Sequence, residues 1–359
     1  MTASRSRAYV RLLVAGSLVA AYLSGAVAPA GAVLPTTPNL TLHHTLQASP
    51  FVGSSVSAED NEGSAYVPRD DSLWLVDDDA QSIYEVNATT GALKRTIDDS
   101  VLSGVRQLGG TASAGTSRSE DLESLAYDEV NDVLYAFSGT CCSSSVRSAA
   151  YRFTRAAGRL EVESFQALDD LDFTAAAWNP GDGMLYTGID DELRTYDYAA
   201  NTVGALVGLN GVDDILGMDF TNDGKDLFVA RYGTTVTRVD WATKREVAGW
   251  SFDLAPLGLL DTRAVEVVGD QLWVSDGYDY RSSGDPLSHA VFVLDLGGST
   301  APPSAPSASF SVSTSSGVAP LPVAFTDTSS GGAPTSWLWD FGDGSVAATA
   351  RPHHTYADA

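Results

Sequence analysis

The apolar positions of this chain recur as short strand-like segments, and five of these segments begin with leucine followed by an aromatic residue. A turn signal built from Asp, Asn, Gly or Ser precedes each pair. The pairs are Leu73-Trp74, Leu134-Tyr135, Leu185-Tyr186, Leu227-Phe228 and Leu272-Trp273. A repeat of roughly 40–50 residues made of short strands is typical of a β-propeller, in which each repeat forms one sheet.

Four of the repeats offer up to four strand candidates between turn signals, but the fifth offers only three. A propeller protects such an open edge by borrowing a strand from the other end of the chain. Residues 42–46 are the candidate for this closing strand. The pattern therefore predicts an all-β, five-bladed propeller over residues 33–296. Residues 98–120 are rich in Gly, Ser and Thr and are interpreted as a long loop, although a divergent blade there would make the ring six-bladed.

Residues 1–32 have the organisation of a secretory signal peptide. Arg5, Arg7 and Arg11 form a basic start, an apolar stretch follows, and Ala30-Gly31-Ala32 is a small-residue cleavage site. The alternative is a membrane anchor, because the apolar run continues to Ala28. No other stretch approaches the ~18 apolar residues of a spanning helix. We therefore expect a secreted or cell-surface protein with no membrane span after cleavage.

The chain is strongly acidic, with 21 Lys and Arg against 46 Asp and Glu and a formal net charge of −25. Cleavage of the signal removes three Arg and no acid, which leaves 18 basic residues and a charge of −28. Such a protein repels nucleic acid at long range, so a nucleic-acid partner is excluded, and it attracts cations. Few lysines and many Ala, Gly and Asp are typical of a bacterial protein.

The two cysteines, Cys141 and Cys142, are adjacent. In an exported protein they form either a strained vicinal disulfide or two free thiols. A zinc site is less favoured, because neither a second cysteine pair nor a nearby histidine completes the ligand set.

An acidic motif lies just before the first strand of the blades. Residues 59–66 of the first repeat, Glu-Asp-Asn-Glu-Gly-Ser-Ala-Tyr, align with residues 120–127 of the second. Acidic residues precede the later blades as well, at 169–172, 213–214 and 261. The first strands of all blades begin at one end of the central channel, so these carboxylates should gather at one mouth. Carboxylate oxygens are the ligands that Ca²⁺ prefers. The predicted metal ligands are Asp60, Glu62, Asp121, Glu123, Asp170 and Asp172. The alternative is that each carboxylate caps a turn and faces water.

The acidic motif, followed by Leu-Trp-Leu-Val-Asp-Asp at residues 73–78, resembles the SdiA-regulated family and, more distantly, the esterase-like phytase family. The resemblance covers roughly residues 55–296. It implies an exported propeller. The first family implies five blades, and the second implies a possible calcium-assisted phosphatase activity. Against a phosphatase, the basic residues that could hold phosphate are scattered, at Arg69, Arg118, Arg231 and Arg263.

The C-terminal residues carry a second signature after a Pro/Ser-rich linker at residues 297–306. Residues 337–344 read Trp-Leu-Trp-Asp-Phe-Gly-Asp-Gly, and residues 352–356 read Pro-His-His-Thr-Tyr. Residues 307–359 thus resemble a PKD domain, an immunoglobulin-like β-sandwich. Trp339 and Phe341 should pack its core. The strand pair that usually follows the Tyr is missing, so we expect either a fragment of a longer protein or a domain that is unstable alone.

The familiar motifs of hydrolases, G-x-S-x-G and H-E-x-x-H, do not occur, and catalytic residues stay unassigned. We therefore predict a secreted or cell-surface protein of the binding or adhesion type rather than an enzyme. Its propeller would recognise an extracellular ligand, either a polysaccharide or a protein, and its PKD domain would act as a spacer. The alternative is a calcium-assisted extracellular hydrolase, phytase-like or lactonase-like, that uses the channel carboxylates.

Overall fold

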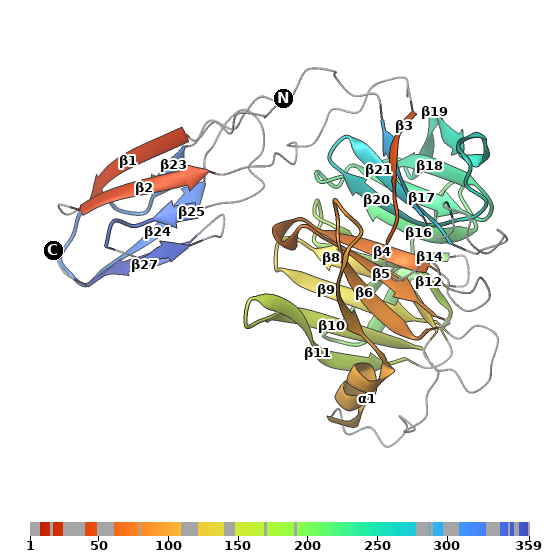
Figure 1. The fold of residues 1–359 in the computed structure, drawn as a ribbon, viewed down its shortest axis with the longest axis horizontal. Coiled ribbons are helices and arrows are strands. Elements are labelled where there is room, and N and C mark those ends of the chain that lie inside the picture. The colour runs from red at the N-terminus through yellow and green to blue at the C-terminus, as the bar shows by residue number, and fades with distance from the viewer. Residues whose placement is uncertain are drawn as a thin grey trace. The chain divides into compact units, whose positions relative to one another are not determined.

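The chain folds into two compact units, one of residues Val33–Gly298 and one of Ser299–Ala359 together with Met1–Ala32. The computed structural model describes residues 8–14, 17–23, 40–48, 61–78, 80–108, 121–139, 148–168, 171–189, 192–277, 287, 290–296, 309–327, 338–343, 345–347 and 352–357. The fold is all-β, as the sequence predicts (Figure 1).

The described strands of the first unit form five four-stranded antiparallel sheets. These are β4 (Asn61–Val67), β5 (Ser72–Asp77), β6 (Ser82–Asn87) and β7 (Leu93–Ile97); β8 (Leu122–Asp128), β9 (Val133–Ser138), β10 (Ala149–Ala156) and β11 (Arg159–Ala167); β12 (Phe173–Asn179), β13 (Met184–Ile189), β14 (Glu192–Asp197) and β15 (Thr202–Leu206); β16 (Ile215–Phe220), β17 (Asp226–Arg231), β18 (Thr235–Asp240) and β19 (Arg245–Asp253); and β20 (Thr262–Val268), β21 (Gln271–Asp276), β22 (Val291–Asp295) and β3 (Thr41–Leu46). We number these blades one to five in that order.

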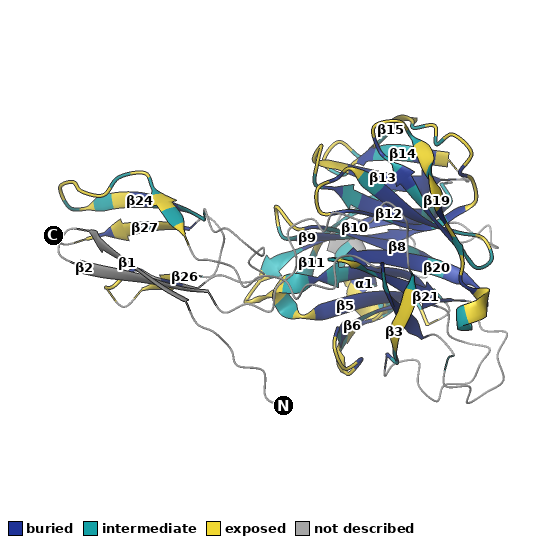
Figure 2. Cartoon of the chain, turned by 90° about the horizontal axis from the view of Figure 1, so that it is seen from above, coloured by how far each residue is buried: buried dark blue, intermediate teal, exposed yellow. Residues whose placement is uncertain are grey.

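The first strand of each blade contacts the first strand of the next, and β20 of the fifth contacts β4 of the first. The sheets therefore close into a ring around a central channel, as in a propeller. These inner strands and the second strands are largely buried, whereas the outer strands β15 and β19 are largely exposed (Figure 2).

The Leu-aromatic pairs all lie on the second strand of their blade. Neighbouring residues on a strand point to opposite faces, so each pair fills two seams between blades. In the first blade, Leu73 packs in the seam with the fifth blade, where it meets Trp273, and Trp74 packs in the seam with the second blade, where it meets Leu134. The other seams pair Tyr135 with Leu185, Tyr186 with Leu227, and Phe228 with Leu272.

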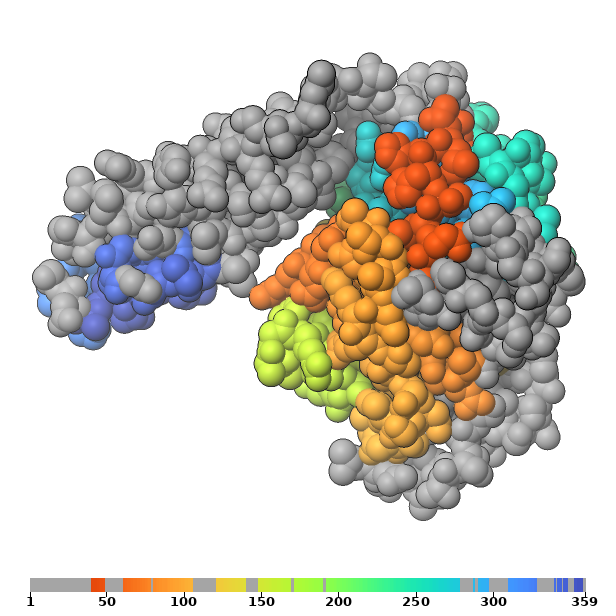
Figure 3. All heavy atoms as spheres, viewed as in Figure 1, coloured from red at the N-terminus to blue at the C-terminus, as the bar shows by residue number. Residues whose placement is uncertain are grey.

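The ring is closed by β3, which pairs antiparallel with β22 from Thr41 opposite Asp295 to Leu46 opposite Val291. This confirms the predicted closing strand. Leu46 and Ala48 also pack in the apolar cluster that contains Leu73 of the first blade. In Figure 3 the red-orange atoms of β3 lie against the orange atoms of that blade.

A helix replaces part of the loop predicted at residues 98–120, where the prediction was wrong. Helix α1 spans Asp99–Leu108, and residues 109–120 lie outside the described part. The carboxylate of Asp98 caps the helix, because its Oδ1 accepts the N–H groups of Ser100 and Val101 at 3.0 and 3.3 Å. Leu102 is fully buried in the seam between the first two blades. This cap and apolar anchor outweigh the composition of the segment.

The second unit contains two small sheets. One holds β23 (Phe310–Val312), β24 (Leu321–Asp327) and β27 (His353–Tyr356), and the other holds β1 (Ala8–Val14), β2 (Ser17–Leu23), β25 (Leu338–Asp340) and β26 (Val346–Ala347). The core is formed by Val323, Phe325, Trp339, Phe341 and Tyr356. Trp339 and Phe341 are therefore core residues, as predicted, and Gly342, with φ of 82°, makes the turn that follows.

Residues of the expected signal peptide form the hairpin β1–β2, and β2 pairs with β25 from Ala20 opposite Asp340 to Tyr22 opposite Leu338. Cleavage of residues 1–32 stays a prediction. Among the described residues, no helix has the length and apolar character needed to cross a membrane. Cys141 and Cys142 lie outside the described residues.

Candidate functional site: the acidic mouth of the channel

The inner strands of all five blades begin in the same way. The residue before each of them is aspartate: Asp60, Asp121, Asp172, Asp214 and Asp261. Each inner strand then carries one residue more than its partner strand. In the first four blades the extra residue is Glu62, Glu123, Thr174 or Leu216. In the fifth blade Arg263 and Ala264 stand opposite Ser275 alone, and Arg263 has the equivalent place two residues after the aspartate. An extra residue of this kind is a β-bulge, which bends the strand and re-aims a side chain. The five bulges therefore lie at equivalent positions near one mouth of the channel.

The position of the bulge in the third blade changes which residues correspond to the predicted ligands of the first two blades. The sequence pattern contributed Asp170 and Asp172 as the third blade's ligands. The structure instead places Asp172 at the position of Asp121, and Thr174 at the position of Glu123. Asp170 and Asp60 lie outside the described residues.

Three of the predicted metal ligands come together at the mouth. Asp121, Glu123 and Asp172 each offer a carboxylate oxygen, and these oxygens lie within 4.8 Å of one another. All three residues are partly buried. They come from two blades, since Asp121 and Glu123 flank the start of β8 and Asp172 precedes β12.

Gly139, just after β9, packs against this cluster. Its N–H donates to the carbonyl oxygen of Asp121 at 2.7 Å. A Cβ atom at Gly139 would lie 2.9 Å from Oδ1 of Asp172 and 3.0 Å from Cγ of Glu123. Only glycine lets the backbone approach the two acidic side chains this closely.

The crowding of like charges changes the acidity of Glu123. Burial raises its pKa well above the usual range, and repulsion from Asp121, Asp78 and Asp172 raises it further, while Arg263 acts in the opposite direction. Like charges crowded at a partly buried site make it unfavourable for all three carboxyl groups to be ionised together.

Glu62 lies elsewhere at the mouth and forms an ion pair. Its Oε2 lies 3.0 Å from Nη1 of Arg263, and Nε of Arg263 lies 2.9 Å from Oδ2 of Asp261. Glu62 is thus held by a cationic side chain and is not part of the three-residue cluster. In the sequence analysis Arg263 was one of several scattered basic residues. It lies two residues after Asp261, just as Glu62 lies two residues after Asp60, and this shared spacing could have placed Arg263 at the channel mouth.

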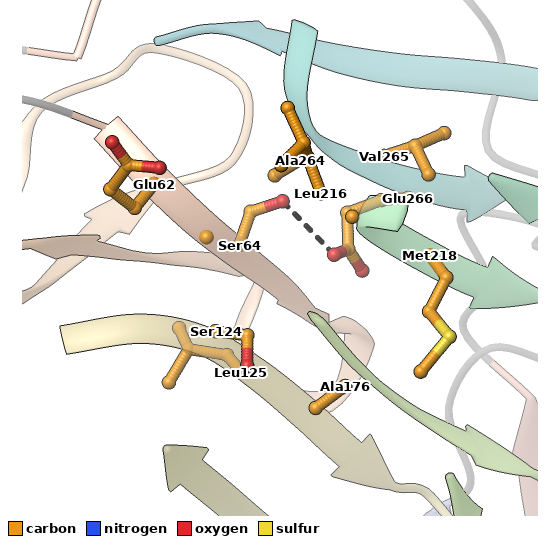
Figure 4. Close-up of a pocket in the computed structure, with 12 residues that line it drawn as sticks. Glu62, Ser64, Ser124, Leu125, Ala176, Leu216, Met218, Ala264, Val265 and Glu266 are labelled. Carbon is orange, nitrogen blue, oxygen red and sulfur yellow. Dashed lines mark hydrogen bonds between the residues drawn. The ribbon is translucent and has the colours of Figure 1, made fainter. Parts of the chain in front are cut away.

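The channel narrows immediately below the mouth. Its cavity has a volume of about 10 Å³, close to what one water molecule needs. The lining is made of small or apolar residues and two carboxyl groups, including Ser64, Ser124, Ala176, Met218, Glu62 and Glu266 (Figure 4). Among the described residues, this part of the channel has room for about one water molecule.

Comparison with known proteins identifies the C-terminal unit. Residues 300–359 match the family model of the PKD domain, which confirms that resemblance. No curated protein matches the sequence.

Comparison with solved structures finds similar chains, and the likeness to the first of them supports the propeller fold. Glutaminyl cyclase from Myxococcus xanthus is 11% identical, with a TM-score of 0.50, over 73% of this chain and 99% of that chain. The PQQ-bound aldose sugar dehydrogenase from Streptomyces coelicolor is 13% identical, with a TM-score of 0.46, over the same shares of the two chains. At this identity a likeness shows the fold alone.

Proposed function

We propose that this chain is an extracellular binding protein whose propeller holds Ca²⁺ at the channel mouth and whose PKD domain acts as a spacer. The observation that carries the proposal is the meeting of Asp121, Glu123 and Asp172 within 4.8 Å. The organisation of residues 1–32 and the PKD domain support export.

The donor set favours calcium over a transition metal. All three groups are carboxylates, which suit hard cations, whereas zinc sites use histidine and cysteine. Ca²⁺ takes about six to eight oxygen ligands, so three carboxylates leave several positions open at a site next to solvent. We propose that oxygen atoms of the ligand, an extracellular polysaccharide or protein, fill these positions.

Thermal melting of the full chain with Ca²⁺ and with a chelator tests the cation site. At 100 times its Kd, a cation that binds only the folded protein stabilises it by about 2.7 kcal/mol. For a chain of this size we expect a rise in Tm of roughly 4–5 °C. The rise should be larger at higher pH, because the raised pKa of Glu123 means that protons compete with the cation.

Matched variants locate the site. Asp121→Asn and Asp172→Asn each remove one ligand charge and should abolish most of the shift. Glu246→Gln makes the same kind of change at an exposed carboxylate on β19 and should leave the shift intact. A wild-type protein that melts identically with Ca²⁺ and with chelator would rule out the site, and an unchanged shift in Asp121→Asn would move it elsewhere.

A calcium-assisted hydrolase is the second candidate, and the raised pKa of Glu123 is the observation that favours it. A buried carboxyl group whose pKa is raised above its usual range can serve as a general acid beside a cation site. Arg263 lies close enough to act on that pKa and supplies a positive charge at the mouth.

The two functions differ in turnover. For a binding protein we expect the full chain with Ca²⁺ to hydrolyse phosphoesters and lactones no faster than the Glu123→Gln variant does. Turnover that is lost in Glu123→Gln and retained in Glu246→Gln would establish the hydrolase instead. The assay is release of product from chromogenic phosphoester and lactone substrates.

A further inference from the structure

A polar hollow lies in the second blade, at the end opposite the channel mouth. Strand β8 runs away from the mouth and ends at Asp128, which pairs with Val133 at the start of β9. The hollow has a volume of about 480 Å³, within the range of about 300–1,000 Å³ that small-molecule sites have. Its lining residues are Asp128, Asn131, Asp132, Val133, Tyr135, Arg152, Thr154 and Arg155. It is therefore a separate site from the three carboxylates at the mouth.

An ion-pair network occupies the guanidinium group of Arg155 completely. Its Nε and Nη2 donate to Asp132 at 2.6 and 3.0 Å. Its Nη1 and Nη2 donate to Asp70 at 3.1 and 2.9 Å, and Nη1 also donates to the carbonyl oxygen of Gly158 at 2.9 Å. These bonds use all five N–H groups of the side chain, so none is left for a phosphate or carboxylate group of a ligand.

The two acids of the hollow are occupied as well. Asp132 also accepts Nη1 of Arg69 and the hydroxyl of Tyr127, both at 2.9 Å. Asp128 is buried, and its carboxylate accepts the backbone N–H and the side-chain amide of Asn131 at 3.0 and 2.7 Å. Carboxylates that are satisfied by protein donors would have to give up these bonds to hold a cation.

The groups that remain for a ligand are mainly neutral. Among the described residues, the hydroxyl of Thr154 and Oδ1 of Asn131 have no hydrogen-bond partner. Tyr135 on β9 and Arg152 on β10 are directly opposite each other, so both face the hollow from the same side of the sheet. Arg152 uses Nη1 for an ion pair with Glu163 and keeps further N–H donors.

The ring of Tyr135 gives the hollow a fixed aromatic wall. Tyr198 of the third blade packs against it, with ring centroids 5.5 Å apart. The hydroxyl of Tyr198 in turn lies 3.0 Å from Oγ of Ser164, at hydrogen-bond distance. Tyr135 is half-buried, so part of its ring faces the hollow. A tyrosine held in this way offers contact area at a low cost in conformational entropy.

We propose that this hollow binds a neutral sugar unit of a polysaccharide. A pyranose ring presents C–H groups on its face, which pack on an aromatic ring, and hydroxyl groups at its edge, which both donate and accept hydrogen bonds. Tyr135 complements the face, and Thr154, Asn131 and Arg152 complement the edge. The other charged groups of the hollow are bonded to each other or to the backbone, so an ionic ligand finds few partners there. Binding at this site needs no Ca²⁺.

Calorimetric titration of the full chain with neutral hexasaccharides, in the presence of a chelator, tests the proposal. The probes are cellohexaose, mannohexaose and chitohexaose, and the charged counterpart is the hexamer of galacturonic acid. We expect saturable binding of at least one neutral probe, and binding of the charged hexamer that is weaker by about tenfold or more. Failure of all three neutral probes to bind at millimolar concentration, or equal binding of the charged hexamer, would overturn the proposal.

Matched variants locate the sugar. Tyr135→Ala removes the stacking face and should weaken binding by about tenfold or more, whereas Tyr135→Phe keeps the ring and should bind nearly as well as the wild type. Thr154→Val keeps the shape of the side chain and loses only the hydroxyl, so its affinity should fall by about two- to tenfold. Tyr232→Ala changes a tyrosine that is 73% exposed in the fourth blade and should leave the affinity unchanged.

Thr154→Val also guards against a loss of folding in Tyr135→Ala, because the hydroxyl of Thr154 makes no hydrogen bond among the described residues. Wild-type affinity in both of these variants would contradict the site. Binding that requires Ca²⁺ and is lost in Asp121→Asn would place the sugar at the mouth instead and would equally exclude the hollow. A chain whose Tm does not respond to Ca²⁺ would contradict the cation site alone and leave the sugar titration unaffected.

Discussion

A chain without residues 40–48 should no longer hold its propeller ring closed. The deletion removes β3, so β22 loses the strand that pairs with it from Val291 to Asp295. It also removes Leu46 from the seam with Leu73, and loss of a buried leucine costs about 2–5 kcal/mol by itself. An exposed edge on β22 would then pair with other chains. We expect a large drop in Tm and aggregates in size-exclusion chromatography.

Adding the deleted strand back as a separate peptide provides a control for this deletion. A synthetic peptide of residues 38–48 should restore the native Tm, because the strand is added by main-chain pairing and by Leu46. A peptide with Leu46→Asp should fail, since the aspartate would enter an apolar seam. If the deleted chain melts like the wild type, β3 does not close the ring.

The variant Gly217→Ala should be among the most destabilising single substitutions in the channel. A Cβ atom at Gly217 would overlap the carbonyl oxygen of Arg263 and lie 2.8 Å from Cα of Ala264. Both are backbone atoms of the neighbouring inner strand, which cannot rotate away as a side chain can. Overpacking of this kind costs about 1–3 kcal/mol, and about 3 kcal/mol corresponds to roughly 5 °C in Tm for a chain of this size.

Gly208 provides the matched control for that substitution. It lies between the third and fourth blades, and a Cβ atom there would meet nothing within 4 Å. Gly208→Ala should therefore change the Tm little. Equal melting of the two variants would show that the inner strands have room to move apart, and would contradict the close packing around the channel.

The propeller could be predicted from sequence because the Leu-aromatic pair supplies an apolar side chain to each of the two faces of its strand. Leu and the aromatic residue of each pair enter different seams, so ring closure requires both at every blade, including Trp273 with Leu73 across the closing seam. Helix α1 was missed because a single cap, Asp98, and a single anchor, Leu102, outweigh a composition typical of loops.

The candidate site was predictable in part. Two blades repeat the acidic motif almost residue for residue, and this repeat singled out Asp121 and Glu123, which lie close together in the structure. Their role as metal ligands stays a prediction. The bulge positions could not be predicted from the sequence. The residues at this position in the other blades, Thr174, Leu216 and Arg263, have no common chemical character that would mark it.

The five bulges have a consequence for how such a protein can diversify. The extra residue of each inner strand has no partner position on the second strand, so its side chain can change without disturbing the pairing that builds the ring. In this chain the five slots hold two acids, a hydroxyl, an aliphatic group and a guanidinium. Recognition can thus be rewritten one blade at a time on a constant frame, which makes these positions a natural starting point for a designed library of ligand-binding propellers.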